Sequence, residues 1–164
     1  MYTQNEIKQM VLPLLKSKGK SYRKFKKVLA RKAKKLERID TITNDGIETT
    51  NRAKTGDYIV KNQTDAGEEY VMSPIKFKDR YKYKKRSKSG YNEYEPKGRI
   101  TALEVNKSFL KKFKLEREFY FEAAWGAKMV AKEKDFLVCP LGGDEIYRIA
   151  RKEFFETYER EERE

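Results

Sequence analysis

The octet A-K-T-G-D-Y-I-V at residues 53–60 returns as A-K-E-K-D-F-L-V at residues 131–138. Each octet is followed by a turn, by a second short segment of β type, and by an aromatic pair four residues apart: Phe77 and Tyr81 in the first copy, Phe154 and Tyr158 in the second. The copies lie 78 residues apart before the turn and 77 after it, so one residue deleted from a surface loop explains the whole offset. Self-similarity at a fixed spacing is the signature of a duplicated unit. We therefore expect two units of the same fold in tandem.

The first unit reads as a strand, two hairpins and a short helix. The stretch 39–50 is rich in Ile and Thr, and its Asp-Gly pair supplies the positive φ that a tight hairpin turn requires. A second hairpin follows over residues 57–72. The Ser-Pro pair at residues 73–74 then supplies an N-cap and a proline at the first helical position.

The second unit repeats this pattern with three differences. The offset between copies grows from 72 to 78 residues, and the inserted residues fall at 107–114, where we expect a helical turn. Lys134 stands where the first copy has Gly56, so the sequence does not assure a matching tight turn. Trp125 has no aromatic counterpart in the first unit; we expect it to cap the second core, with an exposed contact role as the alternative.

The N-terminus carries the capping-box sequence T-Q-N-E at residues 3–6, ahead of apolar residues at helical spacing. We expect the apolar stripe of this helix to pack on the body of the protein, with a dimer seam or a partner groove as the alternative. The fold class that follows is α+β: two tandem β-rich units, each closed by a short helix and related by a pseudo-two-fold, plus an N-terminal helical arm. The expected boundaries are a basic arm at 1–27, a first repeat unit at 28–81, a basic linker at 82–98, a second repeat unit at 99–159 and an acidic tail at 160–164.

The charge balance favours a polyanionic partner. The chain has 164 residues, 40% of them charged, and a formal net charge of +13. Nucleic acid, anionic lipid and an acidic protein would each suit such a charge, and a merely solubilising surface is the alternative.

Two clusters, at residues 16–35 and 82–88, combine cations with interleaved aromatic side chains. Cations can contact phosphates, and exposed rings can stack on bases. We therefore expect a binding protein that contacts nucleic acid through these clusters. The alternative is a protein-interaction or regulatory module of phage or mobile-element type, acting through the N-terminal helix or the groove between the units. The candidate nucleic-acid-binding residues are Lys18, Lys20, Arg23, Lys24, Lys26, Lys27, Lys84, Lys85, Arg86 and Lys88.

The sequence offers little for catalysis. Histidine is absent, which removes the commonest general base and metal ligand. No G-x-x-x-x-G-K-[ST] or G-x-G-x-x-G loop follows an expected strand. Asp57 and Asp135 could act as an acid–base pair or hold Mg²⁺, but an Asp at a strand entry more often accepts N–H bonds from the preceding turn. We expect no enzyme, no catalytic residue, no metal and no cofactor.

Cys139 is the single cysteine, which excludes an internal disulfide and favours a reducing compartment; we expect a buried thiol. No stretch reaches the roughly 18 apolar residues of a membrane span. The N-terminus also lacks the pattern of a secretory signal. We expect a cytoplasmic protein with no membrane partner, and the sequence indicates no oligomeric state.

The motif G-D-Y-I-V at residues 56–60, with E-Y at 69–70 and F-x-x-x-Y at 77–81, resembles a group of small bacterial and tailed-phage proteins. These carry a G-D-aromatic-aliphatic-V segment, a short hairpin and an F-x-x-x-Y helix. The stretch F-E-A-A-W-G at residues 121–126 is similar to a segment of tandem-unit members. The group has no assigned activity, so the resemblance implies the repeated fold and carries over no functional residue.

Overall fold

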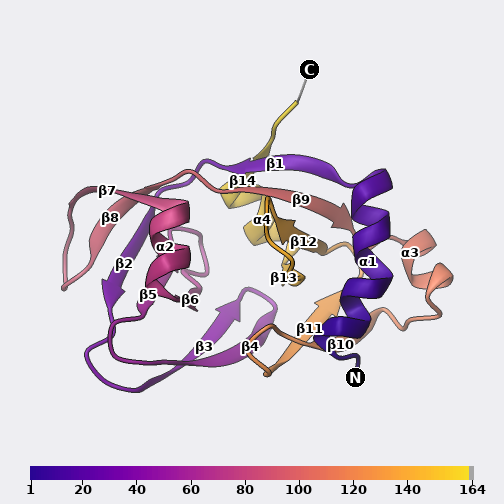
Figure 1. Cartoon of the computed structure of the whole chain (residues 1–164), viewed down its shortest axis with the longest axis horizontal. Coiled ribbons are helices and arrows are strands. Elements are labelled where there is room, and N and C mark those ends of the chain that lie inside the picture. Colours follow the sequence, from indigo (N-terminus) through magenta and orange to yellow (C-terminus); the bar gives the residue numbers. More distant parts are fainter. Residues whose placement is uncertain (163–164) are drawn as a thin grey trace.

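The structure, a computed structural model, describes residues 1–162. These residues form an α+β fold of four α-helices and fourteen strands (Figure 1). Two five-stranded antiparallel sheets carry the two units, and two further strand pairs form separate hairpins. The tandem architecture expected from the repeat is confirmed. No helix within residues 1–162 has the length and apolar composition needed to cross a membrane.

The first unit is built on the sheet with strand order β6-β5-β2-β8-β7. Its core joins Val28 and Val60 of the sheet to Phe77 of the helix α2. The hydroxyl of Ser73 accepts a hydrogen bond from the N–H of Lys76 at the start of that helix, as the Ser-Pro pair predicts. The elements are β2 (Val28–Lys32), β3 (Glu37–Thr43), β4 (Gly46–Ala53), β5 (Tyr58–Asn62), β6 (Glu69–Met72), α2 (Pro74–Arg80), β7 (Tyr81–Arg86) and β8 (Asn92–Pro96).

The second unit has the equivalent sheet order β13-β12-β9-β1-β14. The predicted helical insertion is present as α3, and Lys134 adopts a φ of +79°, close to the +92° of Gly56, so the tight turn is kept. The elements are β1 (Lys20–Lys24), β9 (Arg99–Glu104), α3 (Lys107–Lys112), β10 (Glu118–Glu122), β11 (Lys128–Lys132), β12 (Phe136–Pro140), β13 (Tyr147–Ile149), α4 (Arg151–Thr157) and β14 (Tyr158–Arg160).

Aromatic rings repeat their geometry from one unit to the other. Tyr58 and Phe77 stack with ring centroids 3.9 Å apart and planes 9° from parallel. Phe136 and Phe154 stack with the same 3.9 Å separation and planes 12° from parallel. The two copies therefore share a core arrangement as well as a sequence pattern.

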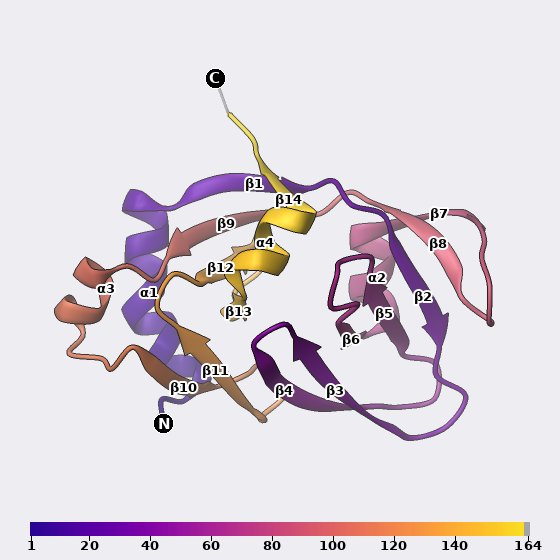
Figure 2. The ribbon, with the colours of Figure 1, turned by 180° about the vertical axis from the view of Figure 1, so that it is seen from behind.

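A third ring stands edge-on to each stack, and it comes from a different part of the chain in each unit. The ring centroid of Tyr94 in β8 lies 4.7 Å from that of Phe77, and the ring centroid of Tyr22 in β1 lies 4.8 Å from that of Phe154. Strand β1 pairs with β9 of the second sheet although it runs directly into β2 of the first, and β8 pairs with β2 although it runs directly into β9 (Figure 2). The N-terminal strand therefore completes the C-terminal unit.

Helix α1 (Gln4–Lys18) belongs to the core of the second unit. Thr3 and Glu6 form the predicted capping box. Ile7, Val11 and Leu15 are buried in the core that includes side chains of β12 and α3. The expectation that the stripe packs on the body is confirmed, so this stripe is not a free surface for a partner.

The structure corrects the expected linker and tail. Residues 82–98 are not a linker, because β7 and β8 pair as a hairpin that completes the first sheet. Charged residues alternate with tyrosines there, and their outward side chains concealed the strand pattern. Arg160 of the expected acidic tail pairs with Tyr22 in the second sheet. Residues 163–164 lie outside the described part of the chain.

Candidate functional site

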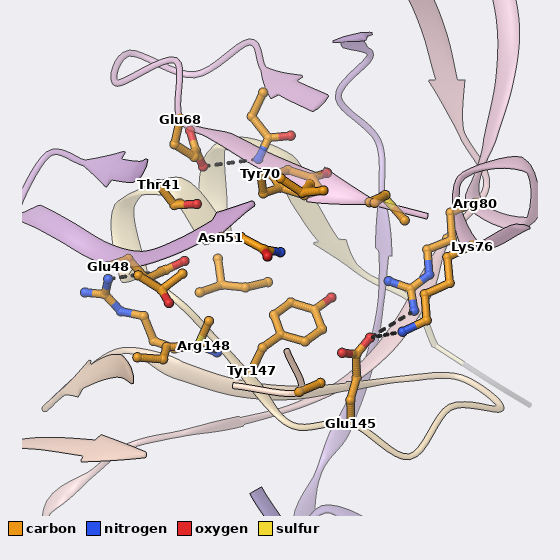
Figure 3. Close-up of a pocket in the computed structure, with 18 of the residues that line it drawn as sticks. Thr41, Glu48, Asn51, Glu68, Tyr70, Lys76, Arg80, Glu145, Tyr147 and Arg148 are labelled. Carbon is orange, nitrogen blue, oxygen red and sulfur yellow. Dashed lines mark hydrogen bonds and ion pairs between the residues drawn. The ribbon is translucent and has the colours of Figure 1, made fainter. Parts of the chain in front are cut away.

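A cavity of about 440 Å³ lies between the two units (Figure 3). The sheets, the β3–β4 hairpin, α2 and α4 all contribute side chains to its walls. Equivalent positions of the two copies face it, and these are Glu68 and Glu145, Tyr70 and Tyr147, and Tyr81 and Tyr158. The pseudo-two-fold thus brings matching residue types to the cavity from both sides.

Lys24 is buried at one end of this cavity. Its ammonium group donates hydrogen bonds to Asn62 Oδ1 at 2.7 Å, Tyr81 Oη at 2.8 Å and Tyr70 Oη at 3.0 Å. Burial lowers the pKa of Lys24 to about 7, because desolvation outweighs the attraction of the nearby Glu68 carboxylate. The hydroxyls of Tyr70 and Tyr81 also lie 2.6 Å apart, and burial raises the pKa of both phenols.

A second group of charges lines the cavity beside α2. Lys76 and Arg80 both approach Glu145, with nitrogen–oxygen distances of 3.6 Å and 3.7 Å. These distances exceed the 2.7–2.9 Å of a close charge-assisted hydrogen bond. Arg80 also lies beside Tyr147, a partly buried phenol whose pKa is raised by desolvation. Lys76 and Arg80 therefore share the single carboxylate of Glu145.

The opposite wall carries an ion network centred on Arg148, whose side chain is fully buried. Its guanidinium donates to Asp135 at 2.7 Å, to Asp45 at 2.7 Å and to Glu48 at 3.0 Å. Asp45 and Glu48 belong to the β3–β4 hairpin, so this network joins the hairpin of the first unit to β13 of the second. Burial raises the pKa of Glu48 to about 8 in spite of the neighbouring guanidinium.

Asp57 and Asp135 have the structural role that their sequence position favours. Asp57 accepts the backbone N–H of Lys54 at 2.9 Å, and Asp135 accepts that of Lys132 at 2.8 Å. Within residues 1–162, no group of three or more Asp, Glu or Cys side chains is placed to hold a metal ion. The Cys139 thiol is free and buried as expected, and burial raises its pKa.

Two further side chains that line the cavity, Trp125 and Asn51, were not predicted to lie there. Trp125 is 40% exposed and donates its Nε1–H to the carbonyl of Thr50 at 2.7 Å, so the prediction of a core position was wrong. Asn51 of β4 accepts the N–H of Arg52 through Oδ1. Asn51 and Tyr147 both project into the cavity (Figure 3). A single sequence gives no signal for them, because the meeting of the two units creates this environment.

The predicted nucleic-acid-binding residues separate into three groups. The assignment of Lys24 is wrong, because the side chain is 7% exposed and cannot reach a phosphate outside. Three others form ion pairs: Arg23 with Glu159, Lys84 with Glu95, and Lys85 with Glu93. The remaining six are exposed and have no ion pair with any residue in 1–162: Lys18, Lys20, Lys26, Lys27, Arg86 and Lys88.

The two predicted clusters meet around Glu95. The hydrogen bond from Lys84 lowers the pKa of Glu95, and Lys27 and Lys82 add to this effect through their charges. Lys27 comes from the first cluster, whereas Lys82 and Lys84 come from the second. The structure therefore brings these clusters together, but with an acidic residue between them.

A set of unpaired cations lies on and next to α1 and α3, which both views show side by side (Figures 1 and 2). We call it the lysine end; it consists of Lys16, Lys18, Lys20, Lys107, Lys111, Lys112 and Lys114. All seven side chains are exposed, and none pairs with an acidic residue of the described chain. The α3 lysines were not among the predicted site residues, because the sequence does not show that α3 lies beside α1.

Comparison of the chain with protein-family models, with curated proteins and with solved structures gives no match in any of the three.

Proposed function

We propose that this chain is a non-enzymatic protein that binds nucleic acid through the lysine end. The observation that carries the proposal is a set of seven exposed lysines without an acidic partner in the described chain, on or next to the neighbouring helices α1 and α3. Two lie on α1, one lies at the start of β1, three lie on α3, and Lys114 lies two residues beyond α3. Ammonium groups neutralise backbone phosphates as point charges, so this surface would bind with little sequence preference. A reducing compartment such as the cytoplasm completes the proposal, because the thiol of Cys139 is free.

The lysine end is a better candidate than the β7–β8 hairpin. Glu93 and Glu95 of β8 neutralise part of the hairpin charge through ion pairs with Lys85 and Lys84. The lysine end has no such acidic partner among the described residues. A phosphate that binds there would therefore displace solvent and counterions and would not have to break an ion pair.

Salt-dependent binding tests this proposal. Fluorescence anisotropy with a labelled short duplex and a labelled single strand would give the observed binding constant as a function of salt concentration. The triple variant Lys107→Gln/Lys111→Gln/Lys112→Gln removes three candidate phosphate contacts. We expect its slope of log K against log salt to be shallower by about 2 to 3, since each contact with duplex DNA contributes about 0.9.

The matched control is Lys34→Gln/Lys35→Gln/Lys97→Gln, which removes the same charge from exposed lysines elsewhere. We expect this control to keep most of the wild-type slope. Equal losses in the two triple variants would show that only net charge matters and would contradict a defined surface. A wild-type slope near zero would exclude nucleic-acid binding altogether.

A further inference from the structure

The cavity between the two units has the volume of a small-molecule site. Its volume of about 440 Å³ lies within the range of roughly 300 to 1,000 Å³ that such sites occupy. Clefts that collect several titratable groups with shifted pKa values are also candidate functional sites. Lys24, Glu48 and Tyr81 are such groups here. No residue of the lysine end lines the cavity, so we consider a separate ligand for it.

The hydrogen bonds that line the cavity leave donors without acceptors. Tyr70 and Tyr81 share one hydroxyl proton in their mutual bond, and Lys24 approaches both oxygens as a donor. While Lys24 carries its proton, the second phenolic proton therefore has no acceptor in the described chain. The two amide protons of Asn51 also have none, because only its Oδ1 takes part in a hydrogen bond. A ligand that matches this lining must supply acceptor atoms.

The charges beside α2 also favour a ligand that supplies acceptor atoms. Lys76 and Arg80 share the single carboxylate of Glu145 at distances that leave donor positions on both cations open. The guanidinium charge of Arg80 helps to lower the pKa of Lys24, so these two residues lie close together. Lys24, Lys76 and Arg80 therefore lie on one side of the cavity. The side formed by α2 and β1 therefore carries a surplus of positive charge.

The acidic residues of the cavity are already occupied. Glu48 binds Arg148, Glu68 accepts from Asn62 and Thr64, and Glu153 accepts the backbone N–H of Asn44. A cationic ligand would have to compete with these bonds. An anionic ligand would instead compete with one carboxylate, that of Glu145, whose contacts with Lys76 and Arg80 are long at 3.6 Å and 3.7 Å.

Apolar groups complete the lining. The ring of Tyr147 projects into the cavity, and Met72, Ile100 and Ile149 contribute apolar side chains to the walls (Figure 3). Trp125 stands at the exposed edge with 40% of its surface accessible. A ligand with an apolar, ring-sized body would bury that body against these side chains.

We propose that the cavity binds a small organic anion, with a carboxylate or phosphate group held by Arg80 and Lys76 and an apolar ring lying against Tyr147. The shared chemistry is an acidic head group on a ring, whether the acid is a carboxylate or a phosphate monoester.

Four probes with the same ring test this proposal: phenyl phosphate, benzoate, benzyl alcohol and benzylamine. Titration of the full chain by ¹H–¹⁵N NMR, up to roughly 10 mM, covers the affinities expected for ligands of about ten non-hydrogen atoms. We expect saturable shifts from at least one anion, at backbone amides of α2 and β13, with a dissociation constant at least tenfold smaller than that of benzylamine. Benzylamine binding as tightly as the better anion, or no saturable shift from either anion, would overturn the proposal.

Three variants separate the head-group contact from a general effect on the fold. Arg80→Gln and Lys76→Gln should each weaken binding of the better anion at least fivefold. Lys78→Gln is the matched control, because Lys78 lies on the same helix, is exposed and does not line the cavity. Because Arg80 is partly buried, Lys76→Gln serves as the test if Arg80→Gln does not fold. An equal loss in Lys78→Gln, or no loss in Lys76→Gln, would contradict the assigned site.

Discussion

The ammonium nitrogen of Lys24 lies 2.8 Å from the hydroxyl oxygen of Tyr81, and this hydrogen bond joins the two sheets. Lys24 belongs to β1 in the second sheet, and Tyr81 begins β7 in the first. Tyr158, which occupies the place of Tyr81 in the second unit, lies with its ring 5.9 Å from the same ammonium group. One lysine from a basic run thus contacts the same position in both copies.

The first prediction concerns the pH dependence that Lys24 gives to stability. Its pKa is about 7 in the folded chain and about 10.5 when unfolded, so between these values the unfolded chain binds a proton that the folded chain does not. The free energy of unfolding should therefore rise with pH across this window, by up to about 3 kcal/mol between pH 7 and pH 9. Urea unfolding at both pH values should show this rise in wild type and a smaller one in Lys24→Met. Parallel behaviour of the two proteins would contradict the burial of a titrating lysine.

The second prediction concerns the ion network of the β3–β4 hairpin. Arg148→Met leaves Asp135, Asp45 and Glu48 without their common partner, and losing one side of a buried ion pair costs about 3 to 5 kcal/mol. The control Arg151→Met removes an exposed guanidinium, and its cost should stay below about 1 kcal/mol. Chemical denaturation measures both. Similar costs for the two variants would show that the network does not stabilise the fold.

The third prediction compares the two equivalent turns. Gly56 has a φ of +92° and no atom within 4 Å of the position a Cβ would take, so Gly56→Ala should cost about 1 to 2 kcal/mol through backbone strain alone. Lys134 already bears such strain at a φ of +79°, so Lys134→Gly should be neutral or stabilising by up to about 1 kcal/mol. Thermal unfolding distinguishes the signs. A clear loss of stability in Lys134→Gly would mean that its side chain makes an important contact.

The fourth prediction tests whether the duplicated cores are equivalent in energy. Phe77→Leu and Phe154→Leu each remove one ring from a stack with a centroid separation of 3.9 Å. Each should cost at least about 1 kcal/mol from lost ring contacts and imperfect repacking. The two costs should agree within about 1 kcal/mol. A severe loss for one variant and a negligible loss for the other would mean that the two stacks contribute unequally to stability.

Local chemistry made much of the fold predictable. The capping box at Thr3, the N-cap at Ser73 and the Asp-Gly hairpin turn depend on residues near one another in sequence, and the structure contains all three. The repeat itself predicted that Phe77 and Phe154 occupy matching places, and their ring contacts confirm it.

Contacts between distant segments could not be predicted in the same way. Lys24 lies within a run of cations that reads as a solvated surface, and only the approach of β5, β6 and β7 encloses it. The cavity is subject to the same limit, because Arg80 and Glu145 come from different units. The hairpin β7–β8 was missed for a different reason: its outward side chains are charged, so the strands lack the apolar content of a typical sheet.

The placement of β1 determines the order in which the two sheets can form during synthesis. On the ribosome, residues 20–24 emerge before both of their partner strands, because β9 and β14 lie further along the chain. At about 5 to 20 residues per second, β1 must wait on the order of ten seconds for β14. The first sheet needs only residues 28–96 and can assemble during that interval. The basic composition of the waiting segment keeps it hydrated and discourages premature pairing with another nascent chain.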